Sequence, residues 1–311
     1  MNNTNLTSHN NKLLDAAQAI KLDPDKAEAA FIARQLVQAT LPHKNPGDIQ
    51  AWSRTNGNLT LTIRSGWDTK KNKAIGYPYG TIPRLLLFWM TTEAVKTNNP
   101  RIELGNSLTK FMRDIGLNPE NGGTGAKRSD ARRMRDQMQR LFRATISFDQ
   151  NQGGRDAWLD MQVAPEGVLW WDEKQPDQPT LWDSWIELSK QFFNAITASP
   201  VPVDIRALKA LKHSPLALDL YAWATYTAYQ TQKTGQSRNV SWKLLHEQLG
   251  AEYHDMKEFA KSCRMALRKV QTVYPEFGIC FERGGVKVLP CNPAISIKQK
   301  ELKSVDKKSY R

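Results

Sequence analysis

The chain has 311 residues and a mass of 35.4 kDa, which is enough for one large domain or for two small domains with an additional arm. Apolar residues make up 40% of the sequence and include ten Trp and ten Phe, so a packed core is expected and general disorder is excluded. Lysine and arginine outnumber aspartate and glutamate by 44 to 31, and the resulting net charge of +13 favours a polyanionic partner such as nucleic acid.

The sequence contains no membrane or export signal. Its longest uninterrupted apolar run, residues 85–90, is far shorter than the ~20 residues of a membrane span. The polar residues 1–11 lack the apolar segment of a secretory signal. We therefore expect a cytoplasmic protein without a membrane partner.

The sequence carries only weak signatures of enzymes and metal sites. Cys263, Cys280 and Cys291 are odd in number and form no CxxC pair, which predicts reduced, mostly buried thiols. The five histidines form no closely spaced pair on one strand, which disfavours a metal-dependent nicking enzyme. Residues 121–128 resemble a phosphate-binding loop without its Gly-Lys-Ser/Thr ending, and we interpret them as a flexible connector. No enzyme activity, cofactor or metal is expected.

Residues 1–47 are expected to form a helical arm. Asp23 is suited to cap a helix, Pro24 to occupy its first position, and the amphipathic pattern continues to about Ala39. A hairpin follows, because Asn56-Gly57 is a two-residue turn signal and residues 59–63 alternate between apolar residues and threonine.

One order of elements then occurs twice. A helix, a strand and a capped helix are expected at 81–97, 102–104 and 107–116, and again at 214–231, 239–240 and 241–250. Identical residues recur 134 positions apart and include both ends of the capped helix: Leu86/Leu220, Trp89/Trp223, Thr91/Thr225, Ala94/Ala228, Thr97/Thr231, Ser107/Ser241 and Gly116/Gly250. This spacing predicts two domains related by internal duplication, at 48–198 and 199–295.

A strongly basic helix comes next in each copy. At 100° per residue, the first has a broad polar arc opposite an apolar one; the arc consists of Arg128, Arg132, Arg135, Gln139, Arg140 and Arg143. The second has a tighter stripe, made of Lys257, Lys261, Arg264 and Arg268. A single basic stripe usually indicates only a solvated helix face. Two stripes at equivalent places favour DNA binding.

Each basic helix leads into an expected hairpin, at 145–163 and at 279–289. Helix, strand, helix, basic helix and hairpin is the winged-helix order, in which the third helix enters the major groove and the wing lies along the backbone. The connector and wings therefore offer phosphate contacts: Lys127, Arg155, Arg283 and Lys287. The fold expected is α+β, mainly helical, with two tandem winged-helix domains.

Two segments lie outside this pattern. Trp170, Trp171, Trp182 and Trp185 bracket an acidic stretch, and we expect a core-anchored loop rather than a base-stacking site, because the acids repel phosphate. Residues 296–311 carry six basic residues against Glu301 and Asp306, which predicts a disordered basic tail.

Four segments of the sequence resemble the plasmid-encoded RepA replication initiators: residues 82–89 (IPRLLLFW), 104–108 (LGNSL), 169–172 (LWWD) and above all 201–219 (VPVDIRALKALKHSPLALD). The likeness extends over about residues 41–290. It implies binding of repeated double-stranded sites at a plasmid origin, opening of adjacent AT-rich DNA, and recruitment of the host replicative helicase and initiator. It also implies a homodimer that represses its own promoter. A winged-helix transcription repressor without origin-opening activity is the alternative.

Overall fold

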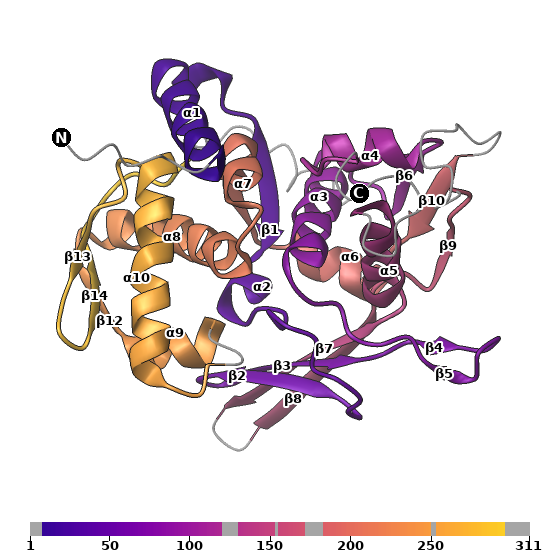
Figure 1. Ribbon diagram of the computed structural model, residues 1–311. Helices are drawn as coiled ribbons and strands as arrows, with labels where there is room; N and C mark the ends of the chain where they lie inside the picture. Colours follow the sequence, from indigo (N-terminus) through magenta and orange to yellow (C-terminus); the bar gives the residue numbers. More distant parts are fainter. Residues whose placement is uncertain (1–7, 120–129, 153–154, 172–182, 250–252, 296–311) are drawn as a thin grey trace, which may run out of the picture. The chain divides into compact units, whose positions relative to one another are not determined.

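The computed structural model describes residues 8–119, 130–152, 155–171, 183–249 and 253–295 (Figure 1). They form a mixed α/β structure with more residues in helices than in strands, which confirms the general class that was expected. The chain folds into two compact units. Unit 1 combines Met1–Phe31 with Val201–Arg311, and unit 2 is the continuous stretch Ile32–Pro200, so the expected arm of residues 1–47 is divided between them.

The N-terminal segment differs from the prediction. Helix α1 (Ser8–Leu22) precedes one 3-10 turn, η1 (Pro24–Lys26), and this turn gives way to strand β1 (Ala29–Ala33) and the short helix α2 (Arg34–Gln38). The expectation of a helix from Pro24 to Ala39 is therefore wrong. Its apolar centre pairs as β1 with β11 (Pro200–Asp204), and burial in a strand overrides the helical pattern.

The short helix before residue 214 was not predicted, but from that residue onward unit 1 follows the predicted order. It contains α7 (Ile205–Leu211), α8 (Pro215–Thr234), β12 (Arg238–Ser241), α9 (Trp242–Leu249), α10 (Met256–Val273), β13 (Ile279–Phe281) and β14 (Gly285–Val288). The Ser214 side chain caps α8 by accepting from the Ala217 amide, and Gly235 ends the helix in the left-handed region. Helix α8 is buried along most of its length and packs against α10. The three strands form an antiparallel sheet in the order β12-β14-β13.

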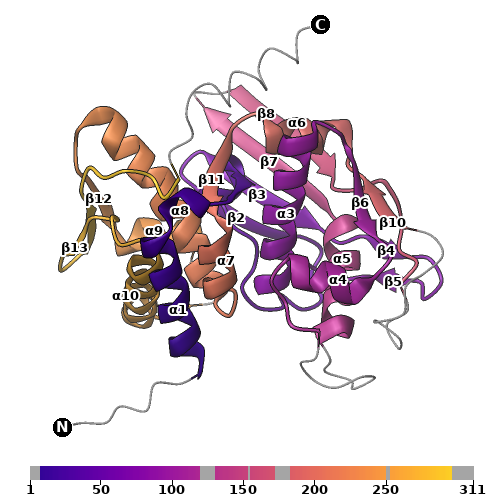
Figure 2. The same ribbon diagram turned by 90° about the horizontal axis from the view of Figure 1, so that it is seen from above.

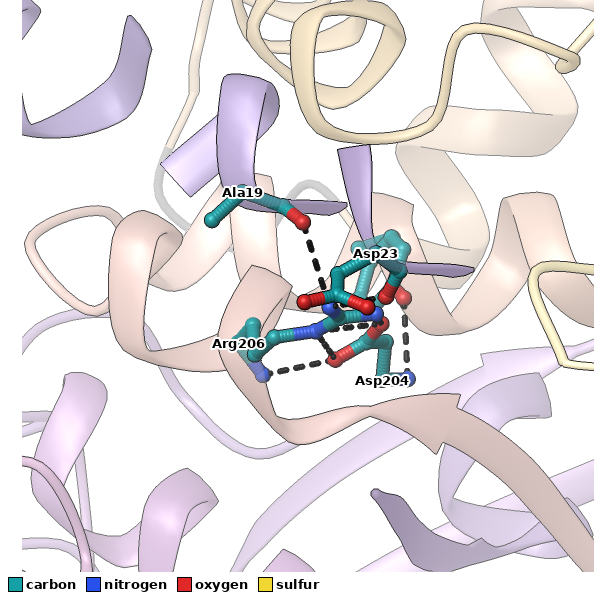
Figure 3. Close-up of polar contacts among 5 residues, drawn as sticks. Ala19, Asp23, Asp204 and Arg206 are labelled. Carbon is teal, nitrogen blue, oxygen red and sulfur yellow. Dashed lines mark hydrogen bonds and ion pairs between the residues drawn. The ribbon is translucent and has the colours of Figure 1, made fainter. Parts of the chain in front are cut away.

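Helix α1 packs against α7 and α10 within unit 1 (Figure 2). Arg206, near the start of α7, holds it there. The Arg206 guanidinium forms an ion pair with Asp204 at 2.7 Å and donates to the carbonyls of Ala19 (3.4 Å) and Asp23 (2.9 Å), as Figure 3 shows. These carbonyls lie at the C-terminal end of α1, where each also accepts from a backbone amide: Ala19 from Asp23 and Asp23 from Lys26, both at 3.2 Å. One side chain of α7 thus adds a second donor to each of two carbonyls at the end of α1 and links the two helices.

Unit 2 contains a four-stranded antiparallel sheet in the order β2-β3-β7-β8. Its strands are β2 (Trp52–Asn56), β3 (Leu59–Arg64), β7 (Thr145–Gln152) and β8 (Arg155–Gln162). The hairpin predicted near Asn56 is confirmed, but its two turn residues are Gly57 and Asn58, since Asn56 pairs with Leu59. A small hairpin follows it, made of β4 (Trp67–Asp68) and β5 (Lys73–Ala74).

In its described part, unit 2 contains four helices after α2, of which three lie where the sequence predicts. They are α3 (Thr81–Thr97), α4 (Leu108–Asp114), α5 (Asp130–Phe142) and the unpredicted α6 (Lys190–Thr197). Ser107 caps α4 by accepting from the Lys110 amide at 3.3 Å, and α3 packs against both α5 and α6. Strands β6 (Arg101–Gly105), β9 (Glu166–Val168) and β10 (Ser184–Glu187) form a second antiparallel sheet in the order β6-β10-β9.

The three-stranded sheets of the two units have corresponding strands. This correspondence changes which hairpin can be the wing of the first domain. Strand β6 stands between α3 and α4 in the chain, as β12 stands between α8 and α9. Strand β6 pairs with β10 and β12 pairs with β14, and in each sheet this partner is the strand that comes last in the chain. Strands β9 and β10 therefore correspond to β13 and β14. The hairpin β7–β8 forms as expected but pairs with β3 and not with β6, because Leu61 and Ile63 of β3 align with Phe148 and Ile146 of β7. The expectation that it is the wing of the first domain is wrong.

Candidate nucleic-acid interface

Helix α10 separates its charges from its core residues as predicted. The Asp255 side chain caps the helix by accepting from the Lys257 amide at 2.8 Å. Lys257, Lys261 and Arg268 are exposed and Arg264 is partly buried. The buried face points into unit 1 and consists of Phe259, Ala260, Cys263, Ala266, Leu267, Val270 and Val273. Burial raises the pKa of the Cys263 thiol to about 12, so this cysteine is a packing residue and not a nucleophile.

Arg264 is held in place by an aromatic stack. Its guanidinium lies 4.7 Å from the ring centroid of Trp242, the first residue of α9. The Trp242 ring in turn stacks on Phe281 of β13, with centroids 6.5 Å apart. A guanidinium over an indole retains donors at its edge while its position is fixed. Arg264 therefore links the basic stripe of α10 to the adjacent sheet.

The β13–β14 hairpin carries the two predicted wing residues. Arg283 is exposed in the turn, and Lys287 is partly buried on β14 opposite Asn239 and Cys280, which are exposed. At Gly285 a Cβ atom would lie 2.2 Å from the Val240 carbonyl oxygen, so this position requires glycine for the close approach of β14 to β12. The Gly-Gly turn thus brings both basic residues next to strand β12.

Helix α5 also buries its apolar arc, which consists of Ala131, Met134, Met138, Leu141 and Phe142. The residues of its predicted polar arc differ in how exposed they are. Arg132 and Gln139 are exposed, Arg135 and Arg140 are partly buried, and Arg143 lies just beyond the last helical residue. The structure therefore groups only part of the arc on an exposed face.

Three of these arginines bind carbonyl groups of the protein itself. Arg135 donates to the Trp171 carbonyl, and Arg143 donates to the Trp67 carbonyl at 2.8 Å. The Arg140 side chain is only 17% exposed; it forms an ion pair with Asp136 at 2.8 Å and lies over the Tyr79 ring. The Arg140 guanidinium also lies close to the backbone of Gly76 and Tyr77. These contacts tie α5 to strand β4, to the segment just before α3 and to the segment that follows β9.

Gly76 shows how closely Arg140 approaches this loop. Its φ of +100° lies in the region that favours glycine, and a Cβ atom there would be 2.6 Å from Arg140 Nη1. Arg140 also donates to the Tyr77 carbonyl at 3.4 Å. The guanidinium occupies the space that a side chain at position 76 would need.

Several predicted residues cannot be placed. Lys127 and Arg128, the glycine connector, Trp182 and the basic tail lie outside the described residues. Arg155 begins strand β8, where it pairs with Gln152, and its side chain lies outside the description. Within the described part, Trp171 is buried and donates its indole N–H to the Gly105 carbonyl at 2.9 Å, whereas Trp170 is half exposed.

One further residue, not predicted from the sequence, lies beside the basic stripe of α10. Met265 is 55% exposed, and it lies one turn from both Lys261 and Arg268. At 100° per residue it is about 40° from Lys261 on the helix circumference. A helical projection of the sequence places this apolar side chain next to the cations on the polar side of α10. That position was the signal that could have identified Met265.

The remaining observations concern metal sites, cysteines and membrane-spanning helices. The described residues contain no group of three His, Cys, Asp or Glu side chains placed to hold a metal ion. Cys280 is exposed and Cys291 is partly buried, so the expectation of mostly buried thiols holds for Cys263 alone. Among the described helices, none combines the length and the apolar character that crossing a lipid bilayer requires.

A basic helix beside a small antiparallel sheet is typical of nucleic-acid-binding proteins. A family model described as plasmid encoded RepA protein matches residues 77–244, more than half of the chain. The chain therefore belongs to the family of plasmid-encoded RepA proteins, which are replication initiators. Among solved structures, that of domain 2 and domain 3 of RctB is 13% identical, with a TM-score of 0.49, and the alignment covers 81% of this chain and 94% of that chain. Comparison with curated proteins gave no match.

Proposed function

We propose that the chain initiates plasmid replication by binding repeated double-stranded DNA sites at the origin, and that it does so through two winged-helix domains that arose by duplication. The observation that carries this proposal is the stripe Lys257, Lys261, Arg264 and Arg268 on α10, next to a hairpin that presents Arg283 and Lys287. In a winged helix these are the helix that enters the major groove and the wing that follows the phosphates.

The charged groups divide between two tasks. Lys261, Arg264 and Arg268 contact base edges, with guanine O6 and N7 the preferred acceptors for arginine. Lys257, Arg283 and Lys287 contact phosphates. Unit 2 contributes from its own basic helix and the segments around it: Lys127, Arg128, Arg132, Gln139 and Arg155. We assign Arg135, Arg140 and Arg143 to holding the fold, because their guanidinium groups already donate within the protein.

Each domain would occupy one major-groove segment, so that one protomer covers about two turns of DNA, roughly 34 Å per turn. Family membership supports the later steps: opening of adjacent AT-rich DNA, recruitment of the host replicative helicase and initiator, and repression of the promoter by a homodimer. The protein acts by binding and not by catalysis.

The test compares charge-matched variants on a selected site. Sequences bound from random DNA first define the repeat, and fluorescence anisotropy then measures affinity for the repeat and for a scrambled duplex. Lys261→Ala with Arg268→Ala should weaken specific binding by ~1–3 kcal/mol for each lost base contact and relax specificity. The control, Lys21→Ala with Lys233→Ala, removes the same charge from exposed positions on α1 and α8. Equal affinities of the two double variants for the repeat would refute the assignment.

Origin opening distinguishes an initiator from a plain repressor. Permanganate oxidises unpaired thymines, so an initiator should produce reactive thymines in the AT-rich segment beside its bound repeats. A repressor would bind the same repeats and leave that segment protected. Relaxed circles formed with divalent metal would instead indicate a nicking enzyme.

A further inference from the structure

The corresponding sheets of the two units carry opposite charge. The unit 1 sheet and its turn hold Arg238, Arg283 and Lys287 against Glu282. The unit 2 sheet, with Asp183 just before β10, holds Arg101 against four carboxylates: Glu103, Glu166, Asp183 and Glu187. A wing that follows a phosphate backbone needs positive charge. The unit 2 sheet is therefore unsuited to the role that its counterpart has in the proposed DNA complex.

An open cavity of about 410 Å³ lies on this sheet. It is lined by Arg101, Glu103, Trp170, Asp183 and Trp185, a set that we call the Trp–acid face. Trp185 stands on the middle strand, opposite Glu103, and Trp170 is held beside it because its amide donates to the Ser184 hydroxyl at 3.0 Å. The volume falls in the range of ligand-binding pockets, and the Trp170 side chain is half exposed.

Arg101 shows which chemistry this face binds. Its guanidinium lies 4.0 Å from the Trp185 ring centroid, and its Nε is 2.9 Å from a Glu103 carboxylate oxygen. One indole and one carboxylate thus already hold a cation. Trp170 and Asp183 supply a second indole and a second carboxylate in the same cavity. Arginine is the side chain that combines stacking on an aromatic ring with a charged hydrogen bond.

We propose that the Trp–acid face binds an arginine side chain in a basic segment of a partner protein. Charge complementarity selects this occupant: the face carries a local excess of carboxylates on a chain with a net charge of +13, so a basic peptide is attracted here and repelled by most other surfaces. Nucleic acid is disfavoured for the same reason. The proposal adds a protein-binding surface to unit 2 and does not depend on which DNA sequence the protein recognises.

The probe is an acetylated hexa-arginine peptide, titrated into the full chain at low salt. Indole N–H resonances of Trp170 and Trp185 are assigned with Trp170→Phe and Trp185→Phe and followed by NMR. Hexa-arginine should shift both resonances, hexa-lysine should bind several-fold more weakly, and hexa-glutamate should shift neither. Asp183→Asn should weaken hexa-arginine binding at least fivefold, whereas Asp15→Asn on α1, an exposed carboxylate of unit 1, should leave it unchanged.

Three results would overturn the proposal. Absence of a shift in both resonances with hexa-arginine excludes the site. A gain in DNA affinity with Asp183→Asn that exceeds the gain with Asp15→Asn would place this face against DNA instead. A shift of both resonances on deletion of residues 296–311 alone would show that the occupant is the basic tail of the chain itself. Wild-type affinity for the selected repeat, measured in the same samples, reports separately on the proposed DNA binding.

Discussion

Helices α5 and α10 occupy the same place in the order of elements, and both have a basic arc opposite an apolar one, yet they use their cations differently. On α10, Lys257, Lys261 and Arg268 are exposed around a stacked Arg264. On α5 and just after it, three arginines instead donate to carbonyls at Trp171, Tyr77 and Trp67. A helical projection identifies the side of a helix that is polar. It does not show what lies against that side.

The cause of the difference is the backbone around each helix. Unit 2 inserts the β4–β5 hairpin and the segment 75–80 next to α5, and these stretches have few ladder hydrogen bonds of their own. A guanidinium has five N–H donors in a planar fork and can satisfy carbonyls that no strand reaches. Helix α10 packs instead against the helices α1, α7, α8 and α9, whose carbonyls are largely bonded within each helix, and its exposed cations stay available for a ligand.

The largest effect should follow from removing Arg140. Arg140→Ala breaks the ion pair with the half-exposed Asp136, removes a mostly buried guanidinium from the Tyr79 ring and leaves the Tyr77 carbonyl without this donor, so we expect a loss of about 2–3 kcal/mol in the free energy of unfolding. Guanidinium chloride denaturation followed by tryptophan fluorescence measures it. Gln139→Ala on the same helix shortens an exposed side chain and should change stability by less than about 0.5 kcal/mol. Equal effects of the two substitutions would show that the internal contacts of Arg140 do not stabilise unit 2.

A substitution at Gly76 should cost slightly less. Gly76→Ala combines an unfavourable φ of +100° with a Cβ atom 2.6 Å from Arg140, and about 1–2 kcal/mol should be lost. Gly57→Ala is the matched control, since Gly57 has φ +59° and open space at its Cβ. In the Arg140→Ala background the extra cost at Gly76 should fall to that of the control. Simple additivity would contradict the contact.

The salt dependence of DNA binding separates the cations by role. Lys287→Ala should reduce the slope of log K against log salt by roughly 0.9, because one phosphate contact is lost. Arg143→Ala removes the same charge from a residue that donates to the Trp67 carbonyl and should leave the slope unchanged. Anisotropy titrations at several salt concentrations give both slopes, and a reduced slope for Arg143→Ala would return that residue to the DNA interface.

The smallest effect concerns Met265. Its exposed thioether between Lys261 and Arg268 is placed to contact a thymine methyl group, as apolar side chains do in the major groove. Replacing one thymine of the repeat by deoxyuridine removes that methyl and should cost about 0.8 kcal/mol, roughly a fourfold loss of affinity. Met265→Ala should bind both duplexes equally. A thymine preference that persists in this variant would assign the methyl contact to another residue.

Elements with strong local signals could be predicted from the sequence. Helix α3 starts after Gly80 and α8 lies between Ser214 and Gly235, both have long apolar stretches, and both basic helices show a clear two-sided pattern. Pairings between distant segments could not be predicted. Strand β1 finds its partner in β11 near residue 200, and β10 pairs with β6 and β9 across long connections without a turn signal. The partners of the arginines around α5 could not be predicted either. Every residue has a backbone carbonyl, so the sequence does not indicate which carbonyl an arginine will contact.

The contact between Arg206 and the end of α1 has a consequence for synthesis of the chain. Unit 2 is continuous, so it can fold while the ribosome is still adding the residues that follow Pro200. Helix α1 is made first, but the side chain that holds its end, and the helices α7 and α10 against which it packs, emerge much later. Helix α1 can therefore complete its packing only after Arg206 and the helices α7 and α10 have been synthesised. The proposed DNA-binding helix α10 is itself complete only once residue 273 has been synthesised, and only then can it pack against α1.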